Sequence, residues 1–298
     1  MQCLDYSLNC EDIVGIGCCR VVSAFNNDTG APAVGKLLDL TQDKATQLKF
    51  FYNEAQMLSK LNSLNCSHIV KMEKSGIVDK FGVIILERLE DDLLELILST
   101  DLNINQKMQI FSEICFGIKE CHDNGVAHLD IKPDNILISK SDFDEKFTVK
   151  LADFGGSANL DNNGLAYNVE GTLHYNAPEV FSQTSDGIDG KKADIWSLGI
   201  VLHILLTNTW PIHTNDPSEI RSLLTNGTVK ISKDLSSTET KFIKNLLNSD
   251  VQQRPTIDEI IASDFFQSFT PTTPKLTKKR SKRGKRGSFL RSFFSKRF

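Results

Sequence analysis

The sequence lacks long hydrophobic runs and any organised set of cysteines. Its most apolar stretch, residues 195–206, is too short to cross a bilayer as a helix. The seven cysteines include no C-x-x-C pair and are odd in number, which argues against a zinc framework and a disulfide scaffold. No basic residue precedes Arg20, which argues against a secretory signal. These absences predict a soluble protein of the cytoplasm, the nucleus or both, with reduced thiols, that is neither secreted nor membrane-spanning.

Charge is distributed unevenly along the chain. Eleven of the 34 lysines and arginines lie in residues 275–298, where there is no acidic residue, so 23 remain against 38 acidic residues in the rest of the chain. Runs of one charge sign are usually solvated and without fixed structure. We therefore expect residues 269–298 to be a basic, disordered C-terminal tail behind an acidic body.

Three partners remain open for residues 275–298. An importin could read the basic cluster as a nuclear address, which is the interpretation we favour. Basic clusters also bind nucleic acid, and the aromatic residues near the end of the tail would suit an anionic membrane surface.

Two motifs in the middle of the chain carry the chemistry. Residues 128–135 read His-Leu-Asp-Ile-Lys-Pro-Asp-Asn, and residues 153–155 read Asp-Phe-Gly. Acids, a lysine and an amide at this spacing are typical of a site that holds metal, phosphate and a hydroxyl together. The two motifs, in this order, resemble the catalytic loop and the metal loop of eukaryotic protein kinases.

The resemblance extends over about residues 8–268. Residues 171–179 are similar to the kinase pattern G-T-x-x-Y-x-A-P-E, and Arg254 matches the arginine that pairs with its glutamate, here Glu179. The family implies an α+β, bilobal fold. A small β-rich lobe with a helix C would cover about residues 8–88, and a larger, mainly helical lobe about residues 92–268.

Hydrophobic periodicity and turn residues predict the elements of this fold. Helical spacing is found in two long segments, and the apolar residues after Asp194 indicate a central helix that is buried on all sides. Three later helices begin with a capping residue three positions before a glutamate, at Asp216, Ser236 and Thr256. The strands predicted in this way are 11–16, 20–25, 33–38, 136–138 and 149–151, and the family resemblance implies two more at 67–71 and 83–87. The two long helices are 43–61 and 104–122, the second with a buried stripe of Ile104, Met108, Phe111, Cys115, Ile118 and His122.

A glycine-containing turn lies between the first two predicted strands. Gly15 and Gly17 could let backbone N–H groups close over phosphates, although a G-x-G alone is more typical of a plain hairpin turn. The segment resembles the kinase pattern G-x-G-x-x-G-x-V, with Arg20 in place of the third glycine and Val22 as the valine. The resemblance makes Gly15, Gly17 and Val22 candidate nucleotide-binding residues.

The family implies further contacts to ATP. A lysine on the third strand would bind phosphates while a helix C glutamate holds it, and the hinge backbone would meet adenine. Glu90, Asp91 or Asp92 could reach the ribose, and the sequence leaves the choice open. The implied nucleotide residues are Val34, Lys36, Glu54, Leu86, Glu87 and Leu89.

The resemblance also assigns catalytic roles. Asp130 would accept or orient the proton of the substrate hydroxyl, and Lys132 would steady the phosphoryl group in transfer. Asn135 and Asp153 would bind Mg²⁺, an ion that prefers oxygen ligands. Lys132 and Thr172 favour the serine/threonine branch of the family, so we expect an ATP- and Mg²⁺-dependent serine/threonine protein kinase that acts as a monomer on protein substrates.

Several departures from the family pattern keep other functions open. Arg20 and Gly35 alter the expected nucleotide site, and Leu129 replaces an arginine that commonly binds an activation-loop phosphate. We therefore predict activity without phosphorylation of that loop, and a preference for basic substrates at Asp92 and Asp134. The alternatives are a catalytically weak pseudokinase scaffold, and a kinase fold that only carries a tail for nucleic acid or membrane.

Overall fold

Six antiparallel strands near the N-terminus form one sheet. This computed structural model describes residues 1–16, 19–41, 43–141 and 146–269. Neighbouring strands follow the spatial order β1-β2-β3-β4-β6-β5. The strands are β1 (Gln2–Cys3), β2 (Tyr6–Ile16), β3 (Arg20–Asn26), β4 (Pro32–Asp39), β5 (Met72–Val78) and β6 (Phe81–Glu87).

Most of these strands agree with the sequence prediction, and one does not. The strand predicted at 11–16 is the second half of β2, whose first half pairs with the end of β3. The strand predicted at 67–71 is wrong, because β5 begins only at Met72. The backbone N–H groups of Ser67 and His68 instead donate to the carboxylate of Glu120, at 3.0 and 2.9 Å. A side-chain acceptor thus serves the first two N–H groups of this segment, whereas Ile69 forms only an isolated bridge with Leu151.

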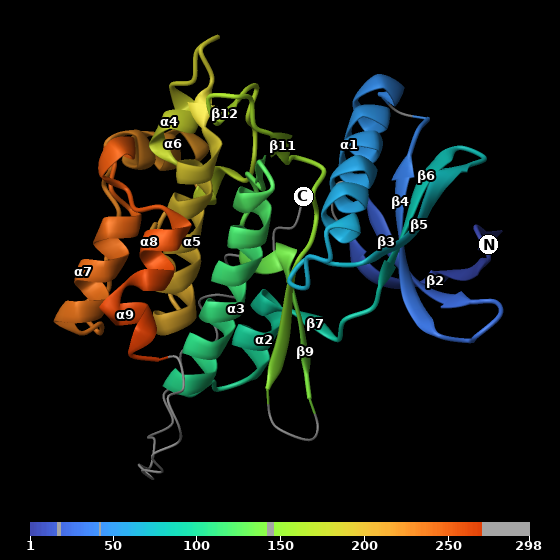
Figure 1. Ribbon diagram of the computed structural model, residues 1–298, viewed down its shortest axis with the longest axis horizontal. Coiled ribbons are helices and arrows are strands. Elements are labelled where there is room, and N and C mark those ends of the chain that lie inside the picture. Colours follow the sequence, from blue (N-terminus) through green and yellow to red (C-terminus); the bar gives the residue numbers. More distant parts are fainter. Residues whose placement is uncertain (17–18, 42, 142–145, 270–298) are drawn as a thin grey trace.

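Helix α1 (Lys44–Ser63) confirms the predicted helix 43–61 and packs against the sheet. Figure 1 shows it between the strands and the helices of the other lobe. The helix approaches the sheet closely at Gly82, where an added Cβ would lie 2.8 Å from Cδ2 of Phe51. Glu54 is buried on the same helix among apolar neighbours. A carboxylate in such a position needs a partner, which the site provides.

The second lobe is mainly helical, so the described chain has the two lobes, one β-rich and one mainly helical, that the sequence analysis expects (Figure 1). Its helices are α2 (Leu93–Ser99), α3 (Ile104–Asp123), α4 (Pro178–Phe181), α5 (Gly190–Thr207), α6 (Pro217–Thr225), α7 (Ser237–Leu246), α8 (Ile257–Ala262) and α9 (Asp264–Gln267), with 3-10 turns η1 (Pro133–Asn135), η2 (Leu173–Tyr175) and η3 (Val251–Gln253). Its short strands are β7 (Asp91–Asp92), β8 (Val126–Ala127), β9 (Ile136–Lys140), β10 (Phe147–Leu151), β11 (Ala158–Asn159), β12 (Leu165–Ala166) and β13 (Ile188–Asp189).

The helix signals of the sequence are confirmed with one exception. Helix α5 is buried on all sides as expected, and the capping residues predicted for α6, α7 and α8 accept hydrogen bonds from the first turns of their helices. The exception is Ile104, which remains 44% exposed because it is the first residue of α3 and extends beyond the packed turns. In the described part of the chain, no helix has the length and apolar character needed to cross a membrane.

Candidate active site

The start of the catalytic loop, residues 128–135, is hydrogen-bonded to one buried residue of α5. The carboxylate of Asp194 accepts the backbone N–H groups of His128 and Leu129, at 2.8 and 2.7 Å, and lies 2.9 Å from Nε2 of His122. Leu129 has a φ of 64°, in the left-handed region that an apolar side chain rarely adopts. The two bonds from Asp194 offset the cost of this conformation and fix the start of the loop.

Asp130 lies at the centre of a cluster of polar contacts. Its carboxylate is 2.8 Å from Nζ of Lys132, accepts Nδ2 of Asn135 at 2.9 Å, and accepts Oγ1 of Thr172 at 2.6 Å. Lys132 also donates to the Thr172 hydroxyl, at 2.7 Å. Burial disfavours the Lys132 ammonium, but the carboxylates around it, Asp130 above all, together outweigh burial and raise the pKa of the lysine above its ordinary value. The structure therefore brings together the predicted catalytic residues Asp130, Lys132 and Asn135.

A second cluster joins the sheet, α1 and the metal loop. Nζ of Lys36, on β4, lies 2.6 Å from Oε2 of Glu54 and 2.8 Å from Oδ1 of Asp153. The side chains of Lys36 and Glu54 are 7% and 1% exposed, whereas that of Asp153 is 34% exposed. Three charges that are 18 and 117 residues apart in sequence thus meet, and only Asp153 retains substantial access to solvent.

Electrostatics fix the charge of the exposed member of this cluster. Burial opposes ionisation of all three side chains. At Lys36 the Asp153 and Glu54 carboxylates outweigh burial and raise the pKa well above its ordinary value, whereas burial dominates at Glu54 and raises the pKa of that carboxyl. At Asp153 burial is the largest single effect, but the charge and hydrogen bond of Lys36 together with nearby Lys132 outweigh it and lower the pKa to about 2. Asp153 is therefore a carboxylate at neutral pH, as a cation ligand must be.

The two predicted magnesium ligands lie on adjoining segments. The backbone N–H of Ala152, next to Asp153, donates to the carbonyl oxygen of Asn135 at 2.9 Å. Both Nδ2 bonds of Asn135 go to Asp130, which directs its side-chain Oδ1 away from that residue. An amide oxygen and a carboxylate oxygen suit Mg²⁺. Since no three His, Cys, Asp or Glu side chains gather as a metal site in the described ranges, the ion would need phosphate oxygens or water as further ligands.

The nucleotide side of the sheet differs from the prediction at Val22. Directly paired residues of antiparallel strands point to the same face. Val21 pairs with Lys36, and Val22 pairs with Gly35. Val22 is fully buried in the cluster on the opposite face, which also contains Leu8. Val22 was thus wrong as a nucleotide contact, because a shift of one residue exchanges the two faces of a strand.

The other predicted sheet residues lie as follows. Val34 and Leu86 are paired across β4 and β6 and belong to the cluster against which Val21 packs. The sequence analysis expected the glycine at position 35 to alter the nucleotide site, but Gly35 faces the opposite cluster. A Cβ on it would lie 2.7 Å from Cδ2 of Leu8. Gly15 lies in β2, while Gly17 is outside the described residues.

The acids of the hinge region serve structural contacts. Glu87 ends β6, and its Oε1 accepts Nζ of Lys150 at 2.6 Å, which joins the two lobes. The carboxylate of Glu90 accepts the backbone N–H of Lys140, and that of Asp92 caps α2. Leu89, between Glu87 and Glu90 in the sequence, is partly buried against the main core. The side chains of the hinge are thus anchored, and the backbone N–H groups of Glu87 and Glu90 donate to the carbonyl oxygen of Lys71 and to Oγ of Ser139. The hinge backbone expected to meet adenine is therefore that of Leu89, which lies between them.

Asn53 is a site residue that the sequence analysis missed. It precedes Glu54 on α1, and its Nδ2 donates to the carbonyl oxygens of Gly155 and Ser157 at 3.0 and 2.8 Å, with a longer contact of 3.3 Å to that of Phe154. Its place beside Glu54 was the only available signal. A polar residue on a helix is usually solvated, so this signal was too weak to identify it.

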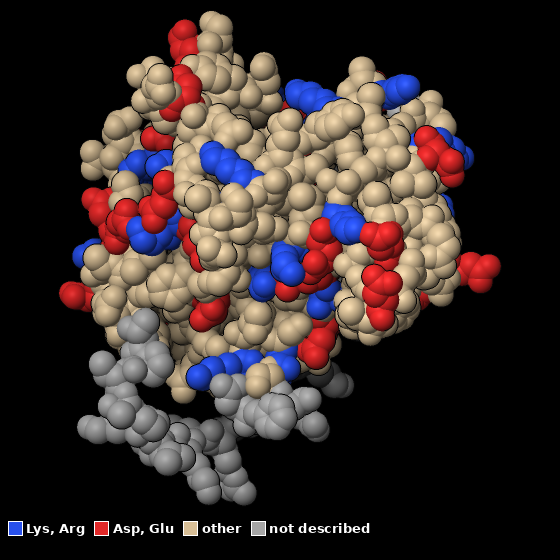
Figure 2. Space-filling view, turned by 45° about the vertical axis from the view of Figure 1, so that its right-hand side comes forward, with Lys and Arg blue, Asp and Glu red and all other residues tan. Residues whose placement is uncertain are grey.

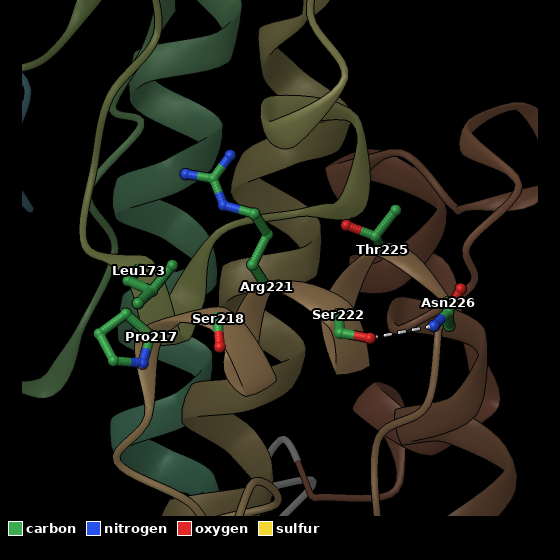
Figure 3. A pocket seen from close by; sticks show the side chains of 7 residues that line it. All are labelled: Leu173, Pro217, Ser218, Arg221, Ser222, Thr225 and Asn226. Atoms are coloured by element: carbon green, nitrogen blue, oxygen red, sulfur yellow. Dashed lines mark hydrogen bonds between the residues drawn. The ribbon is translucent and has the colours of Figure 1, made fainter.

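A groove of about 590 Å³ adjoins the catalytic cluster on the helical lobe (Figure 3). It begins at Leu173, the residue after Thr172, and no acidic side chain lines it. Arg221 lies over the ring of Phe181 at 5.1 Å, and Figure 3 shows its guanidinium extending away from the other labelled side chains. The remaining lining residues are Pro217, Ser218, Ser222, Thr225 and Asn226. The groove therefore begins next to Thr172 and contains none of the predicted nucleotide residues.

Comparison with known proteins agrees with this geometry. The model of the family described as the protein kinase domain matches residues 9–266. The carbon catabolite-derepressing protein kinase of Secale cereale is 29% identical over 263 residues, which are 87% of this chain and 51% of that protein. Two relatives are 28% identical, CBL-interacting protein kinase 21 of Oryza sativa subsp. japonica over 258 residues (85% of this chain, 47% of that protein) and CBL-interacting serine/threonine-protein kinase 20 of Arabidopsis thaliana over 252 residues (83% and 55%). This chain spans about half the length of these curated relatives.

Proposed function

Because the chain belongs to the protein kinase family, we propose that it transfers the γ-phosphoryl group of ATP to serine or threonine hydroxyls of protein substrates. The observation that carries the proposal is that Nζ of Lys36 lies within 2.8 Å of carboxylate oxygens of both Glu54 and Asp153. The segment that carries Asp153 is in turn hydrogen-bonded to Asn135. Phosphoryl transfer needs charge neutralisation and positioning more than covalent help from the protein, and this arrangement offers both. We assign this activity to a domain formed by about residues 8–268.

Each residue of the two clusters has a role in this proposal. Lys36, held by Glu54, would bind the α- and β-phosphates. Asp130 would orient the substrate hydroxyl and take its proton, while Lys132 would steady the phosphoryl group between donor and acceptor. Asn135 and Asp153 would hold Mg²⁺, which neutralises phosphate charge when it is bound.

The serine/threonine assignment rests on Lys132 and Thr172. Both side chains bond to Asp130 and to each other, so they shape the place where the acceptor hydroxyl would approach. A relative whose name states serine/threonine specificity shares 28% identity over most of this chain. These two observations favour serine and threonine over tyrosine as acceptors.

We further propose that activity does not require a phosphorylated activation loop. Leu129 offers no cation to a phosphate and is 6% exposed. Ser157 is buried and donates its hydroxyl to the carbonyl of Phe154 at 2.7 Å, while the hydroxyl of Thr172 is bonded to Asp130. Treating the enzyme with phosphatase should leave its rate within about twofold; a loss of tenfold or more would contradict this part of the proposal.

Substrates rich in basic residues are expected from the acid excess of the body. Before residue 275 the chain carries 23 basic against 38 acidic residues. On the face shown in Figure 2, acidic and basic side chains alternate, so the preference would come from the overall field and from Asp134 more than from a continuous acidic patch. Asp92 contributes less than expected because it caps α2. Equal turnover of acidic and basic peptides would contradict this preference.

The remaining partners and the location follow from the sequence. The tail, residues 275–298, lies outside the described residues, and we keep an importin, nucleic acid and an anionic membrane as its proposed contacts. We propose a monomer that acts in the cytoplasm, the nucleus or both. Salt-dependent binding of the isolated tail peptide to each of the three candidates would separate them.

The decisive experiment compares the wild-type protein with Asp130→Asn in transfer of labelled phosphate from ATP to protein substrates. We expect the variant to lose a factor of about 10² or more in rate, because general base and positioning effects are of that size. ATP binding should be retained in the variant. A wild-type protein that binds ATP and labels no substrate would instead support the pseudokinase scaffold.

A further inference from the structure

The groove on the helical lobe continues from the catalytic cluster along one face of α6. It begins at Leu173, which follows Thr172, and the hydroxyl of Thr172 donates to Asp130 at 2.6 Å. The other lining residues belong to α6 or to its C-cap, on a side of the helix that does not carry the buried Ile220 and Leu224. Helix α6 in turn packs against α4 and η2. A polypeptide whose hydroxyl is bonded to Asp130 therefore meets this groove on one side.

The charge of the groove is positive. Of the described residues that line it, only Arg221 is charged. The acids at the start of α6 are engaged elsewhere, because Asp216 caps the helix and Glu219 accepts the hydroxyl of Thr214 at 2.6 Å. Neither of them lines the groove. An anion that enters it would therefore meet a cation and no lining carboxylate.

The guanidinium of Arg221 retains its hydrogen-bond donors. Its Cζ lies 5.1 Å from the centre of the Phe181 ring, which attracts the charge without offering an acceptor atom. Within residues 1–16, 19–41, 43–141 and 146–269, no oxygen is hydrogen-bonded to the group. Figure 3 shows it apart from Ser222 and Asn226, whose side chains bond to each other at 3.4 Å. The planar fork of N–H donors is thus available to a carboxylate.

The occupant of the groove follows from its chemistry and its position. Arginine binds carboxylates through two parallel N–H bonds, and the partly buried Leu173 and Phe181 offer apolar surface nearby. The tail of this chain does not suit the groove, because residues 270–298 contain no aspartate or glutamate. Continuity with Thr172 and Asp130 instead favours the protein substrate as the occupant.

We propose that Arg221 is a specificity-determining residue, which binds an aspartate or glutamate of the protein substrate close to the serine or threonine that is phosphorylated. The inference rests on the proposed function and names the substrate class of the same site. An extended chain advances about 3.3 Å per residue, so we expect the acid within about five residues of the acceptor. It should lie on one side only, because the groove leaves Thr172 in one direction.

This local preference is compatible with basic residues elsewhere in the substrate. The acid excess of the body attracts positive charge through its overall field, whereas Arg221 acts on the one residue that lies in the groove. The preferred substrate therefore carries an acid at a fixed distance from the acceptor within an otherwise basic segment.

A series of peptides tests the assignment. Each has one serine and a single glutamate, or the isosteric glutamine, at one position within about five residues of it. We expect glutamate to raise kcat/KM about threefold to tenfold over glutamine at one or two positions on one side, mainly through KM. Arg221→Glu should abolish this gain and favour lysine there. Lys241→Glu is the matched control, because it makes the same change of charge on the exposed face of α7 and should keep the gain.

Binding of the same peptides to Asp130→Asn, with ADP and Mg²⁺ and followed by fluorescence anisotropy, separates this inference from the proposed function. A wild-type protein that labels no peptide would refute the proposed function, whereas tighter binding of glutamate peptides that is lost on adding Arg221→Glu would still support the inference. Equal binding of glutamate and glutamine peptides overturns it. So does an Arg221→Glu substitution that weakens both kinds of peptide by the same factor, which would show that Arg221 only supports the fold.

Discussion

The two sides of the candidate site are built by different means. On the helical lobe, the catalytic loop is fixed by hydrogen bonds to buried charged groups, above all Asp194. On the sheet, Val21 and Val34 are positioned by strand register and apolar packing, and Lys36 is the buried charge. A hydrogen bond to a buried carboxylate positions a single backbone group, whereas the register of a strand determines the direction of every side chain on it. Substitutions should therefore act locally on the loop side and through the whole face on the sheet side.

The largest effect is expected where the loop loses its anchor. Asp194→Ala leaves the backbone N–H groups of His128 and Leu129 buried without an acceptor, and we expect the free energy of unfolding to fall by about 3–5 kcal/mol. Urea denaturation measures the loss. The control is Asp258→Ala, which removes an exposed ion pair with Lys119 and should cost less than about 1 kcal/mol. Equal losses in both variants would show that Asp194 is no special anchor.

On the sheet side, the register can be tested with neighbouring valines. Val22→Ala should lower the free energy of unfolding by about 2 kcal/mol, because Val22 is fully buried in the outer cluster, and leave KM for ATP within twofold. Val21→Ala should raise KM for ATP several-fold with a smaller loss of stability. The reverse outcome, measured by denaturation and by steady-state kinetics, would restore Val22 as the nucleotide contact.

A smaller loss is expected from overpacking the same sheet. Gly35→Ala places a Cβ 2.7 Å from Cδ2 of Leu8, so we expect a cost of about 1–3 kcal/mol in the free energy of unfolding. In a Leu8→Ala background the cost should shrink, since the clash is gone. Gly156→Ala is the control, because nothing lies within 4 Å of its added Cβ. If Gly35→Ala is neutral, the strands do not pack as closely as described.

The smallest effect concerns a pH-dependent contact between the lobes. Hydrogen bonds from Glu113 and Glu120 of α3 raise the pKa of His68 to about 9. A raised pKa gives stability that is complete below the ordinary histidine pKa of about 6.5 and is lost as pH rises through 9. His68→Gln should therefore cost about 1 kcal/mol at pH 6 and almost nothing at pH 10. A difference that does not change with pH would exclude the charged contact.

Local signals in the sequence predicted most of the fold and the polar half of the site. Helical periodicity and capping residues act over three or four positions, so α1, α3 and the starts of α6, α7 and α8 could be predicted closely. The predicted pair of Arg254 and Glu179 is confirmed at 2.7 Å. The motif residues meet as expected because each motif is short and rigid, and the fold brings the two motifs together.

The sequence by itself determined which chemical groups this chain possesses and the spacing within each motif. Only the tertiary structure decided that Val21 shares the face of Lys36, that Asn53 bonds to a segment about one hundred residues away, and that Glu120 replaces a strand neighbour for residues 67–68. The physical reason is that a strand exchanges its faces with a shift of one residue, and that a side-chain amide or carboxylate can bond to any backbone the fold brings near it. Neither choice leaves a periodic trace in the sequence.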